Sequence, residues 1–272
     1  MDTELHFQLK ITTIQAQNAE SVCAEIAAYL GEQTGMTTRF INDIPWQERE
    51  RLFDAGEIHI NWMCGLPYVR KADAGAPPVE LLAAPVMRGE RYAGRAVYFS
   101  DVVTLAESPF RTFDDLRGAI WSFNEPNSHS GHNMTRYFLA TLGERNGFFG
   151  KVTQSGAHQT SLRWLLERRI DAAAIDSTVL ETELAANPSL RKRLRRIAVL
   201  GPSPIPPWVA RADLPAAVRH TIREALLAMH TTSAGRAILR RGRMSHFAAV
   251  TDADYDPIRE MAKLADTVSP WV

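Results

Sequence analysis

The sequence predicts an α/β protein of two lobes, each a doubly wound mixed sheet flanked by helices. Strand-like and helix-like segments alternate along most of the 272 residues, as they do in such sheets. A strand candidate around residue 98 and a proline-rich stretch over 201–207 mark two crossings between the lobes. With 45% hydrophobic and 23% charged residues, the chain can bury one large core or two smaller ones.

The first lobe opens as a β-α-β-α-β unit. Apolar residues recur at helical spacing after Asn18, a candidate N-cap, and stop before Gly31. The predicted strands are 9–14, 37–41 and 58–63, with helices over 18–30 and 45–55 between them. Two further strands are expected over 79–86 and 96–103, and the second of these carries the chain into the second lobe.

The second lobe shows the same alternation. Its predicted elements are a capped turn at 112–116, strands at 119–123, 170–175 and 197–200, and helices at 130–142, 159–168 and 178–186. Four prolines within 201–207 fix φ and remove backbone donors, which indicates the return crossing. Helices then follow over 214–230, 233–240 and 254–265, and we expect the last to pack on the first lobe. The predicted lobes are therefore 1–98 with 203–272, and 99–202.

The balanced net charge argues against polyanionic partners. Thirty-one basic and thirty-one acidic side chains cancel, so no long-range field favours nucleic acid or an anionic membrane. The basic runs at 191–196 and 236–243 have no recognition-helix pattern around them, and we interpret both as solvated surface.

The chain has the composition of a soluble protein. No apolar stretch approaches the roughly 20 residues needed to span a bilayer, and 58–69 is short and interrupted by Asn61 and Gly65. Cys23 and Cys64 are expected to be plain thiols. Residues 1–10 lack a basic start and a long apolar run, so we expect the protein in the cytoplasm as encoded. The alternative is the periplasm, if a leader was removed from the chain.

The segment from Glu125 to Gly131 is the candidate site. It lies between a predicted strand and a predicted helix, where the free N–H groups of the first turn meet the carboxyl edge of the sheet. The positive end of the helix dipole, the hydroxyls of Ser128 and Ser130, and the close approach allowed by Gly131 suit a tetrahedral oxyanion. The alternative is that Ser128 simply caps the helix.

Several short motifs, in order, resemble one known family. They are Gly65 to Tyr68, Tyr98 to Ser100, Phe113 to Gly118, Asn127 to Gly131, Ser155 to His158 and Ile170 to Asp176. Together they resemble the phosphate/phosphonate-type, PhnD-like solute-binding proteins of ABC transporters, over roughly residues 9–261.

The resemblance implies a type II periplasmic-binding-protein fold that closes two lobes over a small oxyanion. In that family a Ser-Thr-Ser-Gly helix start grips phosphonate oxygens, and the matching residues here are Ser128, His129, Ser130 and Gly131. His129 departs from the family pattern, which usually has threonine at this position. It replaces a hydroxyl by an imidazole, which can be charged near neutral pH. The ligand is therefore left open among phosphate, phosphonate and related anions.

Four more residues are candidate ligand contacts. Tyr68 and Tyr98 match family positions that face the cleft, although a half-buried packing tyrosine is the plain alternative for Tyr98. His158 begins a predicted helix and Asp176 ends a predicted strand at the same edge. An amine-bearing ligand would also need acidic side chains, for which Asp176, Glu125 and Glu181 are the candidates.

The leading interpretation is a solute-binding protein that presents a small oxyanion to an ABC permease. The same fold working as a cytoplasmic sensor or carrier is the second hypothesis, and an enzyme resembling the thiamine-precursor synthases is the third. No nucleophile motif is present, so no catalytic residue and no cofactor is predicted. His129 and His132 are three residues apart but lack a third ligand, so no metal is predicted either. We expect a monomer with no nucleic-acid partner and no membrane insertion.

Overall fold

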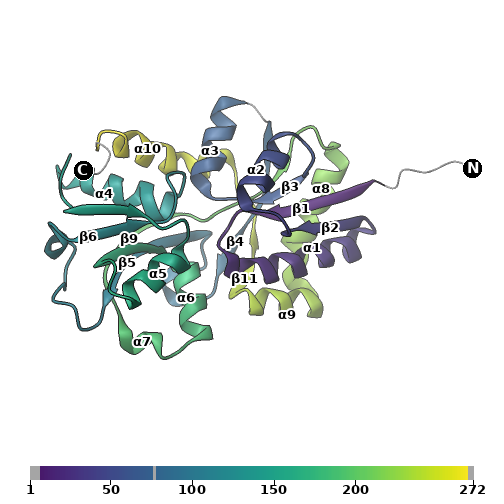
Figure 1. Cartoon of the computed structure of the whole chain (residues 1–272). Helices are drawn as coiled ribbons and strands as arrows, with labels where there is room; N and C mark the ends of the chain where they lie inside the picture. The colour runs from purple at the N-terminus through teal and green to yellow at the C-terminus, as the bar shows by residue number, and fades with distance from the viewer. Residues whose placement is uncertain (1–6, 76–77, 269–272) are drawn as a thin grey trace, which may run out of the picture. The chain divides into compact units, whose positions relative to one another are not determined.

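The computed structural model describes residues 7–75 and 78–268. Two compact units divide the chain. Unit 1 comprises Met1–Ala96 and Ile205–Asp254, and unit 2 comprises Val97–Pro204 and Tyr255–Val272. Each unit is built around its own mixed sheet with flanking helices (Figure 1).

Unit 1 contains a six-stranded sheet in the order β11-β4-β10-β3-β1-β2. Its strands are β1 (Gln8–Thr13), β2 (Thr37–Ile41), β3 (Ile60–Trp62), β4 (Val79–Met87), β10 (Trp208–Arg211) and β11 (Met244–Ala248). Its helices are α1 (Glu20–Thr34), α2 (Trp46–Asp54), α3 (Gly65–Ala74), α8 (Ala216–Ala228) and α9 (Ser233–Arg241). Strands β1, β2 and β3 are parallel, whereas β10 is antiparallel to both of its neighbours. The early part therefore has the predicted β-α-β-α-β form.

Unit 2 contains a five-stranded sheet in the order β7-β6-β8-β5-β9. Its strands are β5 (Val97–Leu105), β6 (Ile120–Phe123), β7 (Lys151–Gln154), β8 (Ala172–Asp176) and β9 (Leu194–Pro204). Its helices are η4 (His129–Asn133), α4 (Met134–Thr141), α5 (His158–Leu166), α6 (Ser177–Ala186), α7 (Leu190–Arg193) and α10 (Asp256–Ala265).

Short 3₁₀ turns of the two units lie at η1 (Gln17–Ala19), η2 (Glu90–Tyr92), η3 (Asp114–Leu116), η5 (Met229–Thr231) and η6 (Asp252–Tyr255).

Five helices and strands were missing from the sequence prediction: α3, α7, β7, β10 and β11. Strand β10 follows the prolines directly and is only four residues long, so it shows little periodicity. Tertiary packing holds it, because Trp208 stacks on Trp62 of β3 with ring centroids 5.9 Å apart. The stretch expected to be only a stiff crossing is in part the end of β9, which runs to Pro204.

The C-terminal helix lies in a different place from the one expected. Helix α10 packs against α4 in unit 2, and Figure 1 shows the two side by side. Its apolar side chains Met261 and Leu264 pack against the core of unit 2, and Arg136 of α4 donates a hydrogen bond to the carbonyl of Val268 at 3.1 Å. The expectation of packing on the first lobe is therefore wrong: the apolar face was identified from periodicity, which does not specify the partner.

An aromatic cluster fills the core of unit 2. Trp121 of β6 stacks on Phe149 at 4.5 Å between ring centroids, and Phe113 packs edge-on against Phe138 of α4 at 4.8 Å. Trp121 is fully buried, and truncating such a side chain typically costs about 3–5 kcal/mol. The cluster fixes α4 against β6, and thereby the loop that joins them.

Within the described ranges, no helix is both long enough and apolar enough to cross a membrane.

Candidate functional site

The loop from β6 to α4 forms the centre of the candidate site. Strand β6 ends at Phe123, and the helix begins with one π-helical turn, η4, before α4 continues from Met134. The π turn arises because the N–H of Asn133 donates to the carbonyl of Ser128, five residues back, at 3.0 Å. The predicted helix over 130–142 therefore starts one residue earlier and with a wider turn, a feature that is frequent at functional sites.

Ser128 caps this helix. Its hydroxyl oxygen accepts a hydrogen bond from the N–H of Gly131 at 3.0 Å, and Ser128 itself has extended backbone angles. The capping alternative is thus realised in the structure. The bond uses the oxygen as acceptor and leaves the hydroxyl hydrogen for another acceptor, so capping and anion binding are compatible.

Gly131 is required here by close packing. A Cβ at this position would lie 1.9 Å from Oδ1 of Asn124 and 3.0 Å from Cε1 of His158. No larger residue fits without displacing the Asn124 amide, which follows β6 directly. The two side chains therefore confine the first turn of the helix.

Ser130 and His158 form a buried pair. Ser130 Oγ lies 3.2 Å from His158 Nε2, and both residues are almost fully buried. Burial lowers the pKa of His158 to about 4, against a smaller opposing effect of the Ala174 carbonyl. The imidazole is therefore neutral at neutral pH, and it orients the Ser130 hydroxyl by hydrogen bonding without adding charge.

His129 does not behave as the sequence suggested. Its side chain is fully buried, with Nε2 2.7 Å from Ser203 Oγ and Nδ1 3.1 Å from Nδ2 of Asn133. Burial lowers its pKa to about 3. The expectation of an imidazole charged near neutral pH is therefore wrong, because desolvation in the core penalises the cation.

Asp176 caps a helix of its own. Its Oδ1 accepts from the backbone N–H of Thr178 at 2.8 Å and from the Thr178 hydroxyl at 2.7 Å, at the start of α6. Burial raises its pKa to about 6, against hydrogen bonds that lower it. Asp176 pairs in register with Ser100 of β5, whose hydroxyl donates to the carbonyl of Ser130 at 2.7 Å. The Ser100 hydroxyl thus links β5, the strand that pairs with Asp176 of β8, to the helix start.

The two tyrosines lie in different units. Tyr98 of β5 is fully buried in unit 2, with its ring centroid 6.4 Å from that of His129. Tyr68 belongs to α3 of unit 1, where its hydroxyl donates to Oδ1 of Asp252 at 2.6 Å. The residues brought together in unit 2 are Ser128, His129, Ser130, Gly131, Tyr98, His158 and Asp176.

The remaining charged and metal-ligand candidates are dispersed. Glu125 accepts a hydrogen bond from Gln154 at 2.9 Å, and partial burial raises its pKa. Glu181 lies on α6. His132 donates from Nδ1 to the carbonyl of Pro126 at 2.9 Å. In residues 7–75 and 78–268, no group of three or more His, Cys, Asp or Glu side chains is arranged to hold a metal ion.

Sequence reasoning missed the polar side chains that support the site. Asn124, Ser100 and Ser203 contact the helix start from β6, β5 and β9. A serine within a strand has no distinctive pattern, so Ser203 could not have been selected, and Ser100 entered only as the last residue of the Tyr98 to Ser100 motif. Asn124 stands directly before the segment from Glu125 to Gly131. It could have been identified as a polar residue at the carboxyl end of a predicted strand.

Comparison with known proteins identifies the family. The model of the periplasmic phosphonate substrate-binding proteins of ABC transporters matches residues 11–255. The phosphonates-binding periplasmic protein of Escherichia coli K12 is 23% identical over 176 residues, which cover 62% of this chain and 51% of that relative. The match thus spans about half the length of the curated relative.

Solved structures share the fold. A binding protein component of an ABC phosphonate transporter from Pseudomonas aeruginosa superposes with a TM-score of 0.83 at 18% identity, covering 95% of this chain and 86% of that one. PhnD1 from Prochlorococcus marinus, in complex with methylphosphonate, gives 0.80 at 19% identity, covering 96% and 99%. The predicted type II periplasmic-binding-protein fold is confirmed. Because the family model covers most of the chain, this protein belongs to the periplasmic phosphonate substrate-binding proteins of ABC transporters.

Proposed function

We propose that this chain binds a small phosphonate or phosphate and delivers it to the permease of an ABC transporter. The observation that carries the proposal is the start of η4, where the Ser128 and Ser130 hydroxyls and first-turn N–H groups gather at a helix N-terminus. First-turn N–H groups have no acceptor within the helix, and the helix dipole favours an anion there. We place the protein in the periplasm rather than the cytoplasm, because its family is periplasmic.

We propose Ser128, Ser130, Gly131 and His158 as the residues that hold the oxyanion. His129 supports the turn from inside unit 2, and Tyr98 packs beside it. The proposed site binds the anion through neutral donors, so its affinity should depend only weakly on ionic strength.

Calorimetric titration with methylphosphonate, aminoethylphosphonate, phosphate, sulfate and acetate tests the proposal. Ser128→Ala and Ser130→Ala should each weaken phosphonate binding about ten-fold or more, since each removes a hydrogen bond to a charged group, worth about 1.5–3 kcal/mol. Ser189→Ala is the matched control, because Ser189 is exposed and its hydroxyl donates to the nearby Asn187. Undiminished binding in both site variants would refute the assignment.

Asp176 is the proposed discriminator for an amine on the ligand. Asp176→Asn keeps a capping oxygen for Thr178 but removes the charge. We expect weaker binding of aminoethylphosphonate with unchanged binding of methylphosphonate. An equal loss for both ligands would assign Asp176 to the structure of the site alone.

A further inference from the structure

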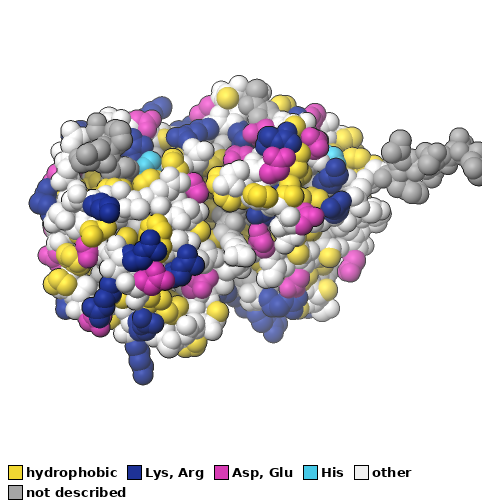
Figure 2. Space-filling view, viewed as in Figure 1, with side chains coloured by type: hydrophobic (Ala, Val, Ile, Leu, Met, Phe, Trp, Pro, Cys, Tyr) yellow, Lys and Arg dark blue, Asp and Glu magenta, His cyan; other side chains and the backbone are white. Residues whose placement is uncertain are grey.

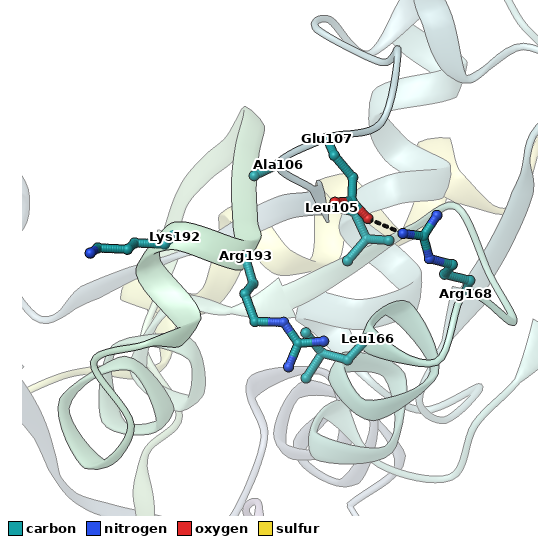
Figure 3. Close-up of a pocket in the computed structure, with 7 residues that line it drawn as sticks. All are labelled: Leu105, Ala106, Glu107, Leu166, Arg168, Lys192 and Arg193. Carbon is teal, nitrogen blue, oxygen red and sulfur yellow. Dashed lines mark hydrogen bonds and ion pairs between the residues drawn. The ribbon is translucent and has the colours of Figure 1, made fainter.

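A hollow in unit 2 involves none of the residues proposed to bind the oxyanion, and we call it the basic groove. Its volume is about 500 Å³, and its lining residues are Leu105, Ala106, Glu107, Leu166, Arg168, Lys192 and Arg193. The ends of β5, α5 and α7 meet here (Figure 3). The N–H of Ala106 donates to the carbonyl of Arg193 at 2.8 Å, and Leu105 pairs with Leu194 of β9, so the backbone on this side is fixed.

The basic run over 191–196 is divided between structure and surface. Arg195 donates to the carbonyls of Ala106, Ser108 and Phe110, and Arg196 pairs with Asp101 at 3.6 Å. Lys192 and Arg193 are exposed, and neither makes an ion pair with any residue in the described parts of the chain. The sequence interpretation of a solvated face therefore holds for only part of the run.

Arg168 completes the positive charge of the groove. It pairs with Glu107 at 2.5 Å, and both side chains are largely exposed. Its φ of 59° places it in the left-handed region directly after α5, where glycine is the usual residue. Arginine thus occupies a position that glycine would fill with less backbone strain. The arginine at this position adds a positive side chain to the groove, which a glycine would not.

The cations do not converge on one point. Figure 3 shows Arg168 joined to Glu107 on one side, Arg193 beside Leu166 on another, and Lys192 pointing away from both. Leu105 and Leu166 add apolar surface between them. This divergence favours a longer segment with several carboxylates over a single small anion. Figure 2 shows more Lys and Arg side chains over α5 and α7.

We propose that the basic groove docks an acidic segment of a partner protein, with glutamate or aspartate side chains at Arg168, Lys192 and Arg193 and an apolar side chain on the two leucines. Charge complementarity carries the choice of partner, since the lining holds three cations and one carboxylate. The groove involves none of the residues proposed to bind the oxyanion, so the two proposals stand or fall separately.

Fluorescence anisotropy with a defined probe tests the proposal. The probe is a fluorescein-labelled peptide of six glutamates and two leucines, and its matched control replaces every glutamate by glutamine. We expect the acidic peptide to bind, with affinity falling steeply as salt increases, and the glutamine peptide not to bind. Competition with phosphatidylglycerol vesicles and with inorganic polyphosphate measures whether other polyanions bind in the same groove.

Three variants complete the design. Lys192→Glu with Arg193→Glu should weaken peptide binding about ten-fold or more, whereas Arg240→Glu, an exposed charge reversal on α9 of unit 1, should leave it unchanged. Arg168→Gly should weaken binding without lowering the melting temperature. Methylphosphonate titration of each variant reports separately on the oxyanion site. Equal peptide binding by the double variant and Arg240→Glu, or binding of vesicles or polyphosphate in place of the peptide, would overturn the proposal.

Discussion

His129 Nε2 lies 2.7 Å from Ser203 Oγ, which ties the first residue of η4 to the end of β9. Asn133 Nδ2 donates to the other ring nitrogen at 3.1 Å, so Nε2 carries the hydrogen that is donated to Ser203. The imidazole is therefore a neutral link between two elements of unit 2. We propose that it contributes to binding by holding the turn in place.

His129→Thr should consequently change affinity by the same factor at every pH. With the pKa of His129 at about 3, its charge does not change between pH 5.5 and 8. Calorimetry on both proteins across this range gives the ratio of their dissociation constants for methylphosphonate. A ratio that varies through a pKa near 6.5 would show that the imidazole acts as a cation.

The two buried histidines should make the fold acid-sensitive. The folded pKa values of His129 and His158, about 3 and about 4, lie below the ordinary 6.5, so below pH 6.5 the unfolded state binds more protons. Asp176 acts in the opposite direction, because its folded pKa of about 6 lies above 3.8. Two histidines against one carboxyl leave about one proton, so the free energy of unfolding should fall by about 1.4 kcal/mol per pH unit between pH 6 and 4.5.

Variants separate these opposing contributions. Urea unfolding at pH 6.0, 5.5, 5.0 and 4.5 should show a shallower dependence for His158→Gln and a steeper one for Asp176→Asn. Parallel curves for wild type and both variants would contradict the assignment of the uncharged histidines and the protonated carboxyl.

Ser128→Asp distinguishes capping from anion binding. Aspartate is as good an N-cap as serine, so stability should remain within about 0.5 kcal/mol of wild type, whereas Ser128→Ala should lose about 1 kcal/mol. A carboxylate at the same point repels an oxyanion, and phosphonate affinity should fall about ten-fold or more. Thermal unfolding measures the stability and calorimetry the phosphonate affinity. Wild-type affinity in Ser128→Asp would show that the anion does not bind at this helix start.

Gly131→Ala should disturb the turn mainly through its contact with Asn124, which is much shorter than the one with His158. The new methyl group meets the Asn124 amide, and overpacking of this kind costs about 1–3 kcal/mol. Adding Asn124→Ala removes that amide and should restore part of the lost stability. A double-mutant cycle in urea measures the coupling, and additive effects would show that the clash is relieved elsewhere.

Leu264→Ala tests the position of α10. Leu264 is partly buried against the core of unit 2, and its truncation should cost about 1–2 kcal/mol. Hydrogen exchange should become faster in α4 and β9, with β1 and α1 of unit 1 as internal controls. Faster exchange in the strands of unit 1 instead would place the helix on the other unit.

Local pattern predicted most of the fold, and the errors have physical causes. The alternating segments around β1, α1 and β2 were readable because each contains its own periodicity. Strands β10 and β11 were not, since they are short and are held by partners distant in sequence, such as Trp62 for Trp208. The partner of α10 was wrong for the same reason: an amphipathic face indicates burial without naming the surface that buries it.

The site was predicted only as far as its local chemistry allowed. The spacing from Ser128 to Gly131 identified a helix start with hydroxyl donors, and the structure contains it. The charge of His129 was mispredicted because a pKa depends on burial, which is a property of the tertiary fold. Asn124 and Ser203 contribute through positions that only the assembled sheet of unit 2 brings together.

Because α10 belongs to unit 2, neither unit corresponds to one uninterrupted piece of the chain. During synthesis, unit 1 lacks β10 and β11 until residues up to 248 have left the ribosome, and unit 2 lacks the helix that covers α4 until residues 256–265 have followed. Helix α10 also contacts η4. The turn proposed to hold the oxyanion thus gains the support of α10 only after residues 256–265 have emerged, so a nascent chain that stops before Asp256 should lack full ligand binding.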